Sequence, residues 1–164
     1  LAFDAGGKLA ASGTKLAELY KALNSLQYYN LPYPKSTGYE WFSSEVRPLL
    51  DKTTAATEDL LHTLIHHNSE QIAQAIKAEQ PKKNSRLLVT GGGALNDCFV
   101  QTLEAKLGGI CTLVVPPKKF MEYKEALVFA LMGVLRELEL PNVLKSVTGA
   151  KEDSCSGKIY QRMS

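Results

Sequence analysis

The residues most able to hold a ligand are three consecutive glycines, Gly91, Gly92 and Gly93. They follow the β-favouring run RLLVT (86–90) and precede a stretch of helical periodicity, which predicts a turn from a strand into a helix. Because glycine has no Cβ, a base, a ribose or a phosphate can approach such a turn closely, and the N-terminus of the next helix favours an anion. The spacing fits neither a Rossmann fingerprint nor a P-loop. We therefore predict a ligand-binding turn of another kind, with a plain tight turn as the alternative.

Two carboxylates, Glu122 and Glu125, follow the pair Pro116-Pro117 and open a strongly apolar helical stretch. Acidic residues in a first helical turn are stabilised by the helix dipole without any catalytic role. If the runs before and after the intervening helix pair as parallel strands, however, these carboxylates lie at the same sheet edge as the glycines. Ligands of open α/β sheets bind at that edge, so a substrate-binding acid is possible there.

Three histidines lie on one long predicted helix, in the sequence HTLIHH (62–67). His62 and His66 have the spacing of two metal ligands on one helical face, but the acid of H-E-x-x-H is missing and no further ligand is suitably spaced. We predict no metal site and a partly buried packing role for His62, His66 and His67.

A second group of polar residues lies in the loop NLPYPKSTG (30–38), which its prolines keep from being helical. Lys35, Ser36 and Thr37 are possible contacts for phosphate or sugar hydroxyls, although such a triplet is common in loops.

The elements that must position these groups form a strand, helix, strand, helix series at the C-terminal side of a helical region. Strands separated by a crossover helix favour parallel pairing, with helices covering the sheet. This predicts a helix-rich α/β fold, with further strands in polypeptide outside this chain. The expected elements are a leading loop over 1–13, a helix from Thr14 through Leu26, a short helix over 40–50 broken at Pro48, a long helix from Thr53 or Thr54 to about Glu79, strands over 86–90 and 110–115, and helices over 94–107 and 121–138.

The composition is that of a soluble globular domain: 164 residues, 45% of them hydrophobic and 22% charged, with a net charge of +2. That charge is too small to predict a nucleic-acid or anionic-membrane partner, and no apolar run reaches the roughly 18 residues of a membrane span. Because the first residue is Leu1 rather than Met, we expect a processed chain or a piece of a longer one. An odd number of cysteines without C-x-x-C spacing predicts no disulfide framework and fits a reducing cytoplasm; they are Cys98, Cys111 and Cys155.

Several stretches are distinctive when taken together and in order. They are FDAGGKLAASG (3–13), PYPKSTGYEWF (32–42), LLVTGGGALN (87–96), KEALVFALMGVL (124–135), SVTGA (146–150) and DSCSGKIY (153–160). Together they resemble the C-terminal part of the anhydro-N-acetylmuramic acid kinase family, and they cover nearly the whole chain. SVTGA combined with TGGGALN is far more specific than a single glycine motif.

The resemblance implies one ribonuclease-H-like half of an actin-like ATPase fold, as in sugar kinases, Hsp70 and actin. It implies an enzyme that uses Mg²⁺-ATP and water to open the 1,6-anhydro ring of the amino sugar and phosphorylate its 6-oxygen in cell-wall recycling, and that forms a homodimer. By this resemblance Gly91, Gly92, Gly93 and Asn96 bind the nucleotide and Glu125 contacts the sugar. Glu122 has no counterpart, and PKSTG matches a family signature without individual roles.

The same resemblance leaves the chain without a catalytic residue. The family's phosphate loop and the aspartate that activates the water are expected to precede residue 1, and the order of motifs excludes Asp4 from that role. We therefore expect residues 1–164 to be a C-terminal nucleotide- and sugar-contacting domain, inactive without an N-terminal domain. The alternatives are a non-catalytic nucleotide-binding or assembly module of the same fold, and a small βαβ enzyme, which requires the two strands to be neighbours.

Overall fold

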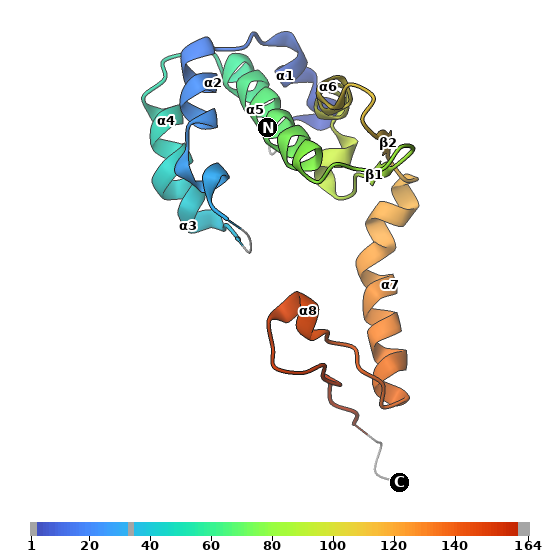
Figure 1. The fold of residues 1–164 in the computed structure, drawn as a ribbon. Helices are drawn as coiled ribbons and strands as arrows, with labels where there is room; N and C mark the ends of the chain where they lie inside the picture. Colours follow the sequence, from blue (N-terminus) through green and yellow to red (C-terminus); the bar gives the residue numbers. More distant parts are fainter. Residues whose placement is uncertain (1–2, 33–34, 161–164) are drawn as a thin grey trace. The chain divides into compact units, whose positions relative to one another are not determined.

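The computed structural model describes residues 3–32 and 35–160, so Tyr33 and Pro34 of the predicted loop lie outside the described residues. The chain forms two compact units, one running to Pro116 and the other starting at Pro117. The first unit holds a two-stranded sheet and most of the helices, and the second holds a long helix and a short one (Figure 1).

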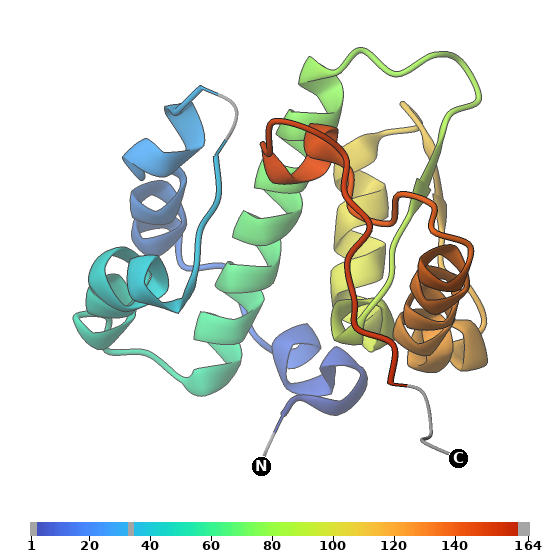
Figure 2. The same cartoon turned by 90° about the horizontal axis from the view of Figure 1, so that it is seen from below.

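The first unit is built around one long helix, α5 (Thr57–Ala78), with shorter helices on both sides (Figures 1 and 2). Its other elements are η1 (Ala5–Gly7), α1 (Lys8–Ser12), α2 (Ala17–Asn24), η2 (Gln27–Asn30), α3 (Tyr39–Trp41), η3 (Phe42–Val46), α4 (Arg47–Asp51), β1 (Arg86–Leu88), η4 (Gly92–Leu95), α6 (Asp97–Leu107) and β2 (Thr112–Val114). The helix-rich α/β character predicted from the sequence is confirmed.

The two strands are parallel neighbours, as the sequence predicts, with Leu87 opposite Leu113. Helix α6 packs on one face of this pair and on α5, and the cluster contains Leu103 and Leu107, each 1% exposed. On the opposite face of the strands Leu88 is 55% exposed, so among the described residues of the first unit a helix covers only the α6 side. Strand β1 ends at Leu88, shortly before the glycines, so the glycine turn lies at the carboxyl edge of this parallel pair.

A second apolar cluster joins the short helices to the first half of α5, with Leu19, Leu23 and Val46 buried at its centre. The helix expected over 40–50 is not broken at Pro48. Instead, residues 39–51 stay helical through a π-helical stretch, η3, directly before the turn that carries Pro48. A widened turn of this kind accommodates a residue that lacks a main-chain N–H.

The prediction of a leading loop over 1–13 is wrong for the described residues. Residues 5–12 are helical, and Gly7 and Ala10 are buried. The Asp4 carboxylate accepts hydrogen bonds from the main-chain N–H groups of Leu9, at 2.9 Å, and Ala10, at 3.0 Å. A carboxylate that satisfies free N–H groups at a helix start stabilises even a short helix, and α1 is further held by its packing on α5.

Two predicted helix starts are also wrong. Helix α2 begins at Ala17 rather than Thr14, because the Thr14 main-chain N–H and hydroxyl both donate to Asp59 Oδ1, at 2.7 and 3.0 Å. Helix α5 begins at Thr57 rather than after Thr53 or Thr54, and its end agrees with the prediction. At α2 the contact of Thr14 with Asp59 accompanies the later start, and at α5 the residue before the helix is Ala56, whose side chain makes no capping hydrogen bond.

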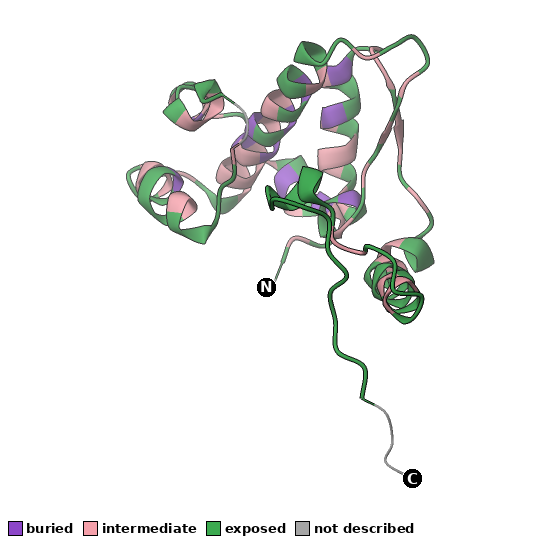
Figure 3. Ribbon diagram, turned by 60° about the horizontal axis from the view of Figure 1, so that its bottom comes forward, coloured by how far each residue is buried: buried purple, intermediate pink, exposed green. Residues whose placement is uncertain are grey.

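The second unit consists of α7 (Lys118–Glu137), the short helix α8 (Lys145–Thr148) and a C-terminal segment. Asn142 fastens that segment to α7: its Nδ2 donates to Met132 O, at 3.1 Å, and to Ser156 O, at 2.9 Å. No described residue of α7 is buried, although its sequence is strongly apolar (Figure 3). Among the described residues, no helix has both the length and the hydropathy needed to cross a bilayer.

Candidate functional site

The glycine turn has a main-chain conformation that requires glycine at its first position. Gly91 has φ 85° and ψ −172°, in a region of the Ramachandran map that is essentially restricted to glycine. The turn then tightens into η4, where the N–H of Ala94 donates to Gly91 O at 3.1 Å. Residues with a Cβ do not easily adopt this main-chain conformation after β1, so glycine is required at position 91 for structural reasons.

The next glycine has no such structural reason. Gly92 lacks a positive φ, and a Cβ placed on it would meet no atom within 4 Å; the same open space surrounds Gly91. At Gly93 a Cβ would only come within van der Waals distance of the Phe99 ring, at 3.8 Å. The main chain at Gly91 and Gly92 is therefore open to a ligand, as expected for a binding turn, and the strand–turn–helix geometry predicted for it is confirmed.

Asn96 has a local structural role besides the predicted contact with a nucleotide. Its Oδ1 accepts a hydrogen bond from the main-chain N–H of Phe99, at 2.9 Å, and so caps α6. The same oxygen lies where a Cβ on Gly7 would be, so Asn96 also fixes the approach of the η1–α1 segment. Its role in nucleotide binding stays a prediction.

A cavity of about 400 Å³ lies between the η1–α1 segment and the first turns of α6, and Gly91, Gly92 and Gly93 are not among the residues that line it. Gly6 and Gly7, both with positive φ, form one wall, and Lys8 and Asp97 are its charged lining residues. The sequence analysis did not identify Gly6 and Gly7 as residues that line a cavity. The usable signal was the glycine pair in FDAGG, since adjacent glycines permit such a close approach of two main chains.

The three histidines do not form one site: His62 and His66 lie together, whereas His67 has other partners. His62 Nδ1 lies 2.7 Å from Ala10 O, and the His62 and His66 rings contact each other with centroids 4.5 Å apart. Burial is the main cause that lowers the pKa of His66. Among the described residues, no three His, Cys, Asp or Glu side chains are placed together to hold a metal ion.

His67 is 2% exposed and belongs to a buried hydrogen-bond network. Asn24 Oδ1 accepts from Gln71 Nε2, at 2.7 Å, and lies 3.1 Å from His67 Nδ1, which must therefore carry a proton. His67 Nε2 is then the acceptor for the Tyr29 hydroxyl, at 2.8 Å. Burial lowers the pKa of His67 to about 4, so the ring is neutral at pH 7. The predicted packing role is confirmed for His67, with a hydrogen-bonding role added.

Glu122 and Glu125 do not lie in the first turn of their helix, because α7 begins at Lys118. The expected dipole stabilisation therefore does not apply to them. Glu122 pairs with Lys118 at 3.5 Å, and Glu125, whose side chain is 81% exposed, lies 3.6 Å from Lys124. Both carboxylates belong to the second unit, and contact of Glu125 with a sugar stays a prediction.

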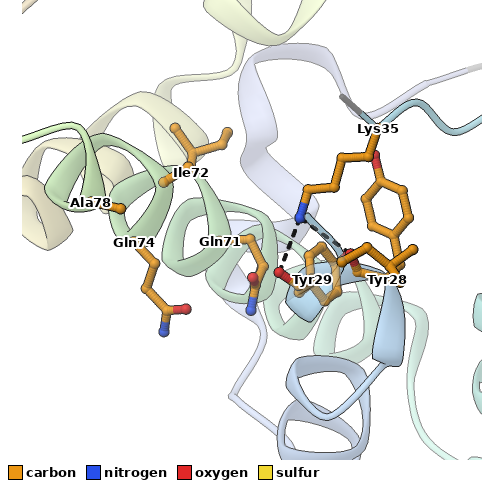
Figure 4. Close-up of a pocket in the computed structure, with 9 residues that line it drawn as sticks. Tyr28, Tyr29, Lys35, Gln71, Ile72, Gln74 and Ala78 are labelled. Atoms are coloured by element: carbon orange, nitrogen blue, oxygen red, sulfur yellow. Dashed lines mark hydrogen bonds between the residues drawn. The ribbon is translucent and has the colours of Figure 1, made fainter. Parts of the chain in front are cut away.

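Lys35 is half-buried, whereas Ser36 and Thr37 are exposed. The Lys35 ammonium donates to the main-chain oxygens of Tyr28 and Tyr29, at 3.2 and 3.0 Å, and lines a pocket against α5 (Figure 4). The three predicted contacts are thus not equivalent: only Lys35 lines this pocket.

Comparison with known proteins decides the family. The model of the anhydro-N-acetylmuramic acid kinase family matches residues 1–162. This chain belongs to the anhydro-N-acetylmuramic acid kinase family. The kinase resemblance predicted from the ordered motifs is confirmed.

Curated anhydro-N-acetylmuramic acid kinases are similar along almost the whole chain. The enzyme of Actinobacillus pleuropneumoniae serotype 3 is 32% identical over 98% of this chain, that of Rhodococcus erythropolis 33% over 96%, and that of a Shewanella species 35% over 94%. The chain spans 44%, 40% and 42% of the length of these kinases, respectively. The matched region is thus less than half the length of each of these relatives.

Proposed function

We propose that the protein to which this chain belongs is an ATP-dependent kinase of the anhydro amino sugar. Water opens the 1,6-anhydro ring, the γ-phosphoryl group of ATP passes to the 6-oxygen, and N-acetylmuramic acid 6-phosphate and ADP are the products, which serves cell-wall recycling. The observation that carries this proposal is the family match over residues 1–162. The names of the relatives, all anhydro-N-acetylmuramic acid kinases, support the substrate class.

Within that kinase, we propose that this chain supplies the nucleotide-binding turn and one sugar contact. Gly91 and Gly92 offer an open main chain at the carboxyl edge of β1, and α6 begins at Asp97, after η4 and Asn96. Glu125 is the proposed sugar contact. Support for an actin-like ATPase half comes from the parallel strands, the crossover helix between them and the glycine turn.

We propose further that the chain alone has no turnover, because the general base is expected outside it. A base must reach the water it activates, and Asp4, the carboxylate closest in type to a phosphate-loop aspartate, is bound to the start of α1. Mg²⁺ supplies charge neutralisation of the phosphates when bound, but the described residues offer it no ligand set. Phosphorylation of the sugar by this chain alone would contradict this part of the proposal.

Calorimetry with Mg²⁺-ATP tests the nucleotide turn. Gly92→Val places a branched side chain on the open face of the turn without main-chain strain, so we expect binding to weaken at least about tenfold. The matched control is Gly133→Ala in α7, another glycine with open space and no positive φ. Equal binding by both variants and by the unsubstituted chain would remove the turn from the proposed site.

A non-catalytic nucleotide-binding or assembly module of the same fold is the second candidate. It is favoured by the exposed apolar side chains of α7, such as Leu127 and Phe129, which are 61% and 69% exposed and suit an interface. A homodimer is the assembly we propose, to be measured by light scattering.

We also propose a cytoplasmic location, supported by the three cysteines, which are free thiols.

A further inference from the structure

The second unit contains a pocket of about 400 Å³ between the C-terminal half of α7 and the C-terminal segment. The helix contributes Phe129, Met132 and Arg136 to its lining, and the C-terminal segment contributes residues 156–159. Glu125, the proposed sugar contact, precedes Arg136 on the same helix by roughly 16 Å along its axis. The pocket is therefore separate from that contact.

Hydrogen bonds join the two walls of this pocket. Asn142 is bonded twice to Ser156: its Nδ2 donates to Ser156 O, at 2.9 Å, and its Oδ1 accepts from the Ser156 main-chain N–H, at 2.7 Å. The same Nδ2 donates to Met132 O on α7, at 3.1 Å, and Arg136 Nε donates to Gly157 O, at 2.9 Å. Because its walls are joined without a ligand, the pocket loses less conformational entropy when a ligand binds.

The charged side chains of the pocket are both cationic. They are Arg136 and Lys158, no described Asp or Glu lines the pocket, and neither cation forms an ion pair with a described residue. The Arg136 guanidinium donates to Gly157 O and, at 3.8 Å, to Cys155 Sγ, and its other N–H groups have no hydrogen-bond partner in the described part of the chain. N–H groups of a guanidinium match the oxygens of a phosphate or a carboxylate, so the pocket favours an oxyanion.

Beside the two cations the lining is apolar. Phe129 and Ile159 are 69% and 45% exposed, and Met132 is half-buried. A free phosphate ion would leave these side chains in contact with water, whereas an apolar group attached to the phosphate would cover them, which is favourable. The pocket therefore suits an oxyanion that carries an apolar group rather than a polar one.

We propose that this pocket binds a phosphate monoester of an apolar alcohol. Its phosphate lies on Arg136 and Lys158, and its apolar part lies on the three apolar side chains just named. Two cations favour this ligand over a carboxylate, because a phosphate monoester is close to a dianion at pH 7 and a carboxylate carries a single charge. Two sources share this chemistry: a soluble aryl or alkyl phosphate, and a lipid whose headgroup is a phosphate. Neither the glycine turn nor the proposed sugar contact takes part, so the proposal is independent of the proposed kinase function.

The test is a calorimetric titration of the full chain with phenyl phosphate, glucose 6-phosphate and benzyl alcohol. Glucose 6-phosphate has the same dianion on a polar body, and benzyl alcohol has an apolar body without the charge. We expect saturable binding of phenyl phosphate and at least about tenfold weaker binding of the other two. No saturable binding of phenyl phosphate, or equal binding of either other compound, overturns the proposal.

Vesicles distinguish the two sources once phenyl phosphate binds. Sedimentation of the chain with phosphatidylcholine vesicles that contain phosphatidic acid, but not with phosphatidylcholine alone, identifies the lipid as the ligand. Sedimentation with neither kind of vesicle identifies the soluble phosphate.

A matched pair of lysine variants locates the binding. Lys158→Gln removes one charge of the lining, and Lys151→Gln removes the same charge from an exposed position of the same unit outside the lining. We expect Lys158→Gln to weaken binding of phenyl phosphate at least about threefold and Lys151→Gln to leave it unchanged. If both variants bind like the unsubstituted chain, or both lose binding equally, the ligand is not in this pocket and the proposal is wrong. Arg136→Gln should abolish saturable binding, and the lysine pair decides the question if the loss of its bond to Gly157 keeps that variant from folding.

Discussion

At the scale of single residues, His67 shows how burial and hydrogen bonding together select one protonation state. Its ring is almost fully enclosed, its Nδ1 proton points to Asn24 and its Nε2 accepts from Tyr29. A second proton would require the Tyr29 hydroxyl to give up its role as donor, and it would place a charge where water cannot reach it. The neutral ring is thus part of the folded structure.

Stability should therefore depend on pH through His67. Its pKa is lowered from 6.5 to about 4, so the unfolded chain binds the proton first, and the contribution is present above pH 6.5 and lost as the pH falls toward 4. The loss is about 3 kcal/mol in the free energy of unfolding. Glu70, whose pKa is lowered by its hydrogen bond from Lys106, loses its contribution in the same direction, below its ordinary value of 4.5.

Urea unfolding at several pH values checks this. We expect His67→Gln to flatten the rise of the unfolding free energy between pH 4 and 6.5 relative to the unsubstituted chain. A slope that is unchanged in the variant would show that His67 is not the group responsible.

Two neighbouring glycines of the turn should differ in their effect on stability: the main-chain conformation at Gly91 requires glycine, whereas that at Gly92 does not. Gly91→Ala should destabilise the fold by about 1–3 kcal/mol, because alanine cannot easily adopt φ 85° and ψ −172°. Gly92→Ala should change stability by less than about 1 kcal/mol, since its Cβ would meet open space. Thermal unfolding of the two variants measures the difference, and equal losses would contradict the geometry described for the turn.

At the scale of elements, the sequence predicted the parts governed by local pattern. The strands, the glycine turn, α6 and the end of α5 follow from β-favouring runs, glycines and helical periodicity, all of which act over a few residues. Asn96 as the cap of α6 was within reach of the same reasoning. The parallel pairing followed from the crossover helix between the strands.

The elements that sequence reasoning missed depend on contacts between distant segments. Segment 3–13 is helical because Asp4 binds its main chain and because it packs on α5, and neither is visible in a Gly- and Ala-rich stretch. Periodicity located α5, but it counts only apolar side chains and so does not show that some buried residues of this helix are polar. Two of these polar residues have partners elsewhere in the chain: Thr63 accepts from the main-chain N–H of Leu16, and His67 is bonded to Tyr29.

The contact between η1–α1 and α6 gives a prediction at this scale. At Gly7, φ is 72° and a Cβ would collide with the Asn96 side chain, so Gly7→Ala both strains the main chain and disturbs the cap of α6. We expect a loss of at least about 1–3 kcal/mol in the unfolding free energy. Gly109→Ala, where φ is also positive but the space is open, is the control for main-chain strain alone. Equal losses would mean that the contact with Asn96 contributes nothing.

At the scale of the whole molecule, the chain accounts for less than half the length of the kinases it resembles, and it forms two units of different character. The first has two buried clusters and the candidate nucleotide turn. The second has no buried residue in α7, whose apolar side chains require a covering surface. The family could be identified from the sequence because its motifs are spread over both units. The catalytic base, by contrast, is expected outside both units.

The most direct test of this account is product formation by the whole protein that contains this chain. With Mg²⁺-ATP and anhydro-N-acetylmuramic acid, ³¹P NMR should detect N-acetylmuramic acid 6-phosphate and ADP in equal amounts. Gly133→Ala should keep this activity, and Gly92→Val should lower the apparent affinity for ATP at least about tenfold. Absence of the sugar phosphate with a folded, ATP-binding protein, or an unchanged apparent affinity of Gly92→Val for ATP, would contradict the assignment of this chain as the nucleotide-binding part of such a kinase.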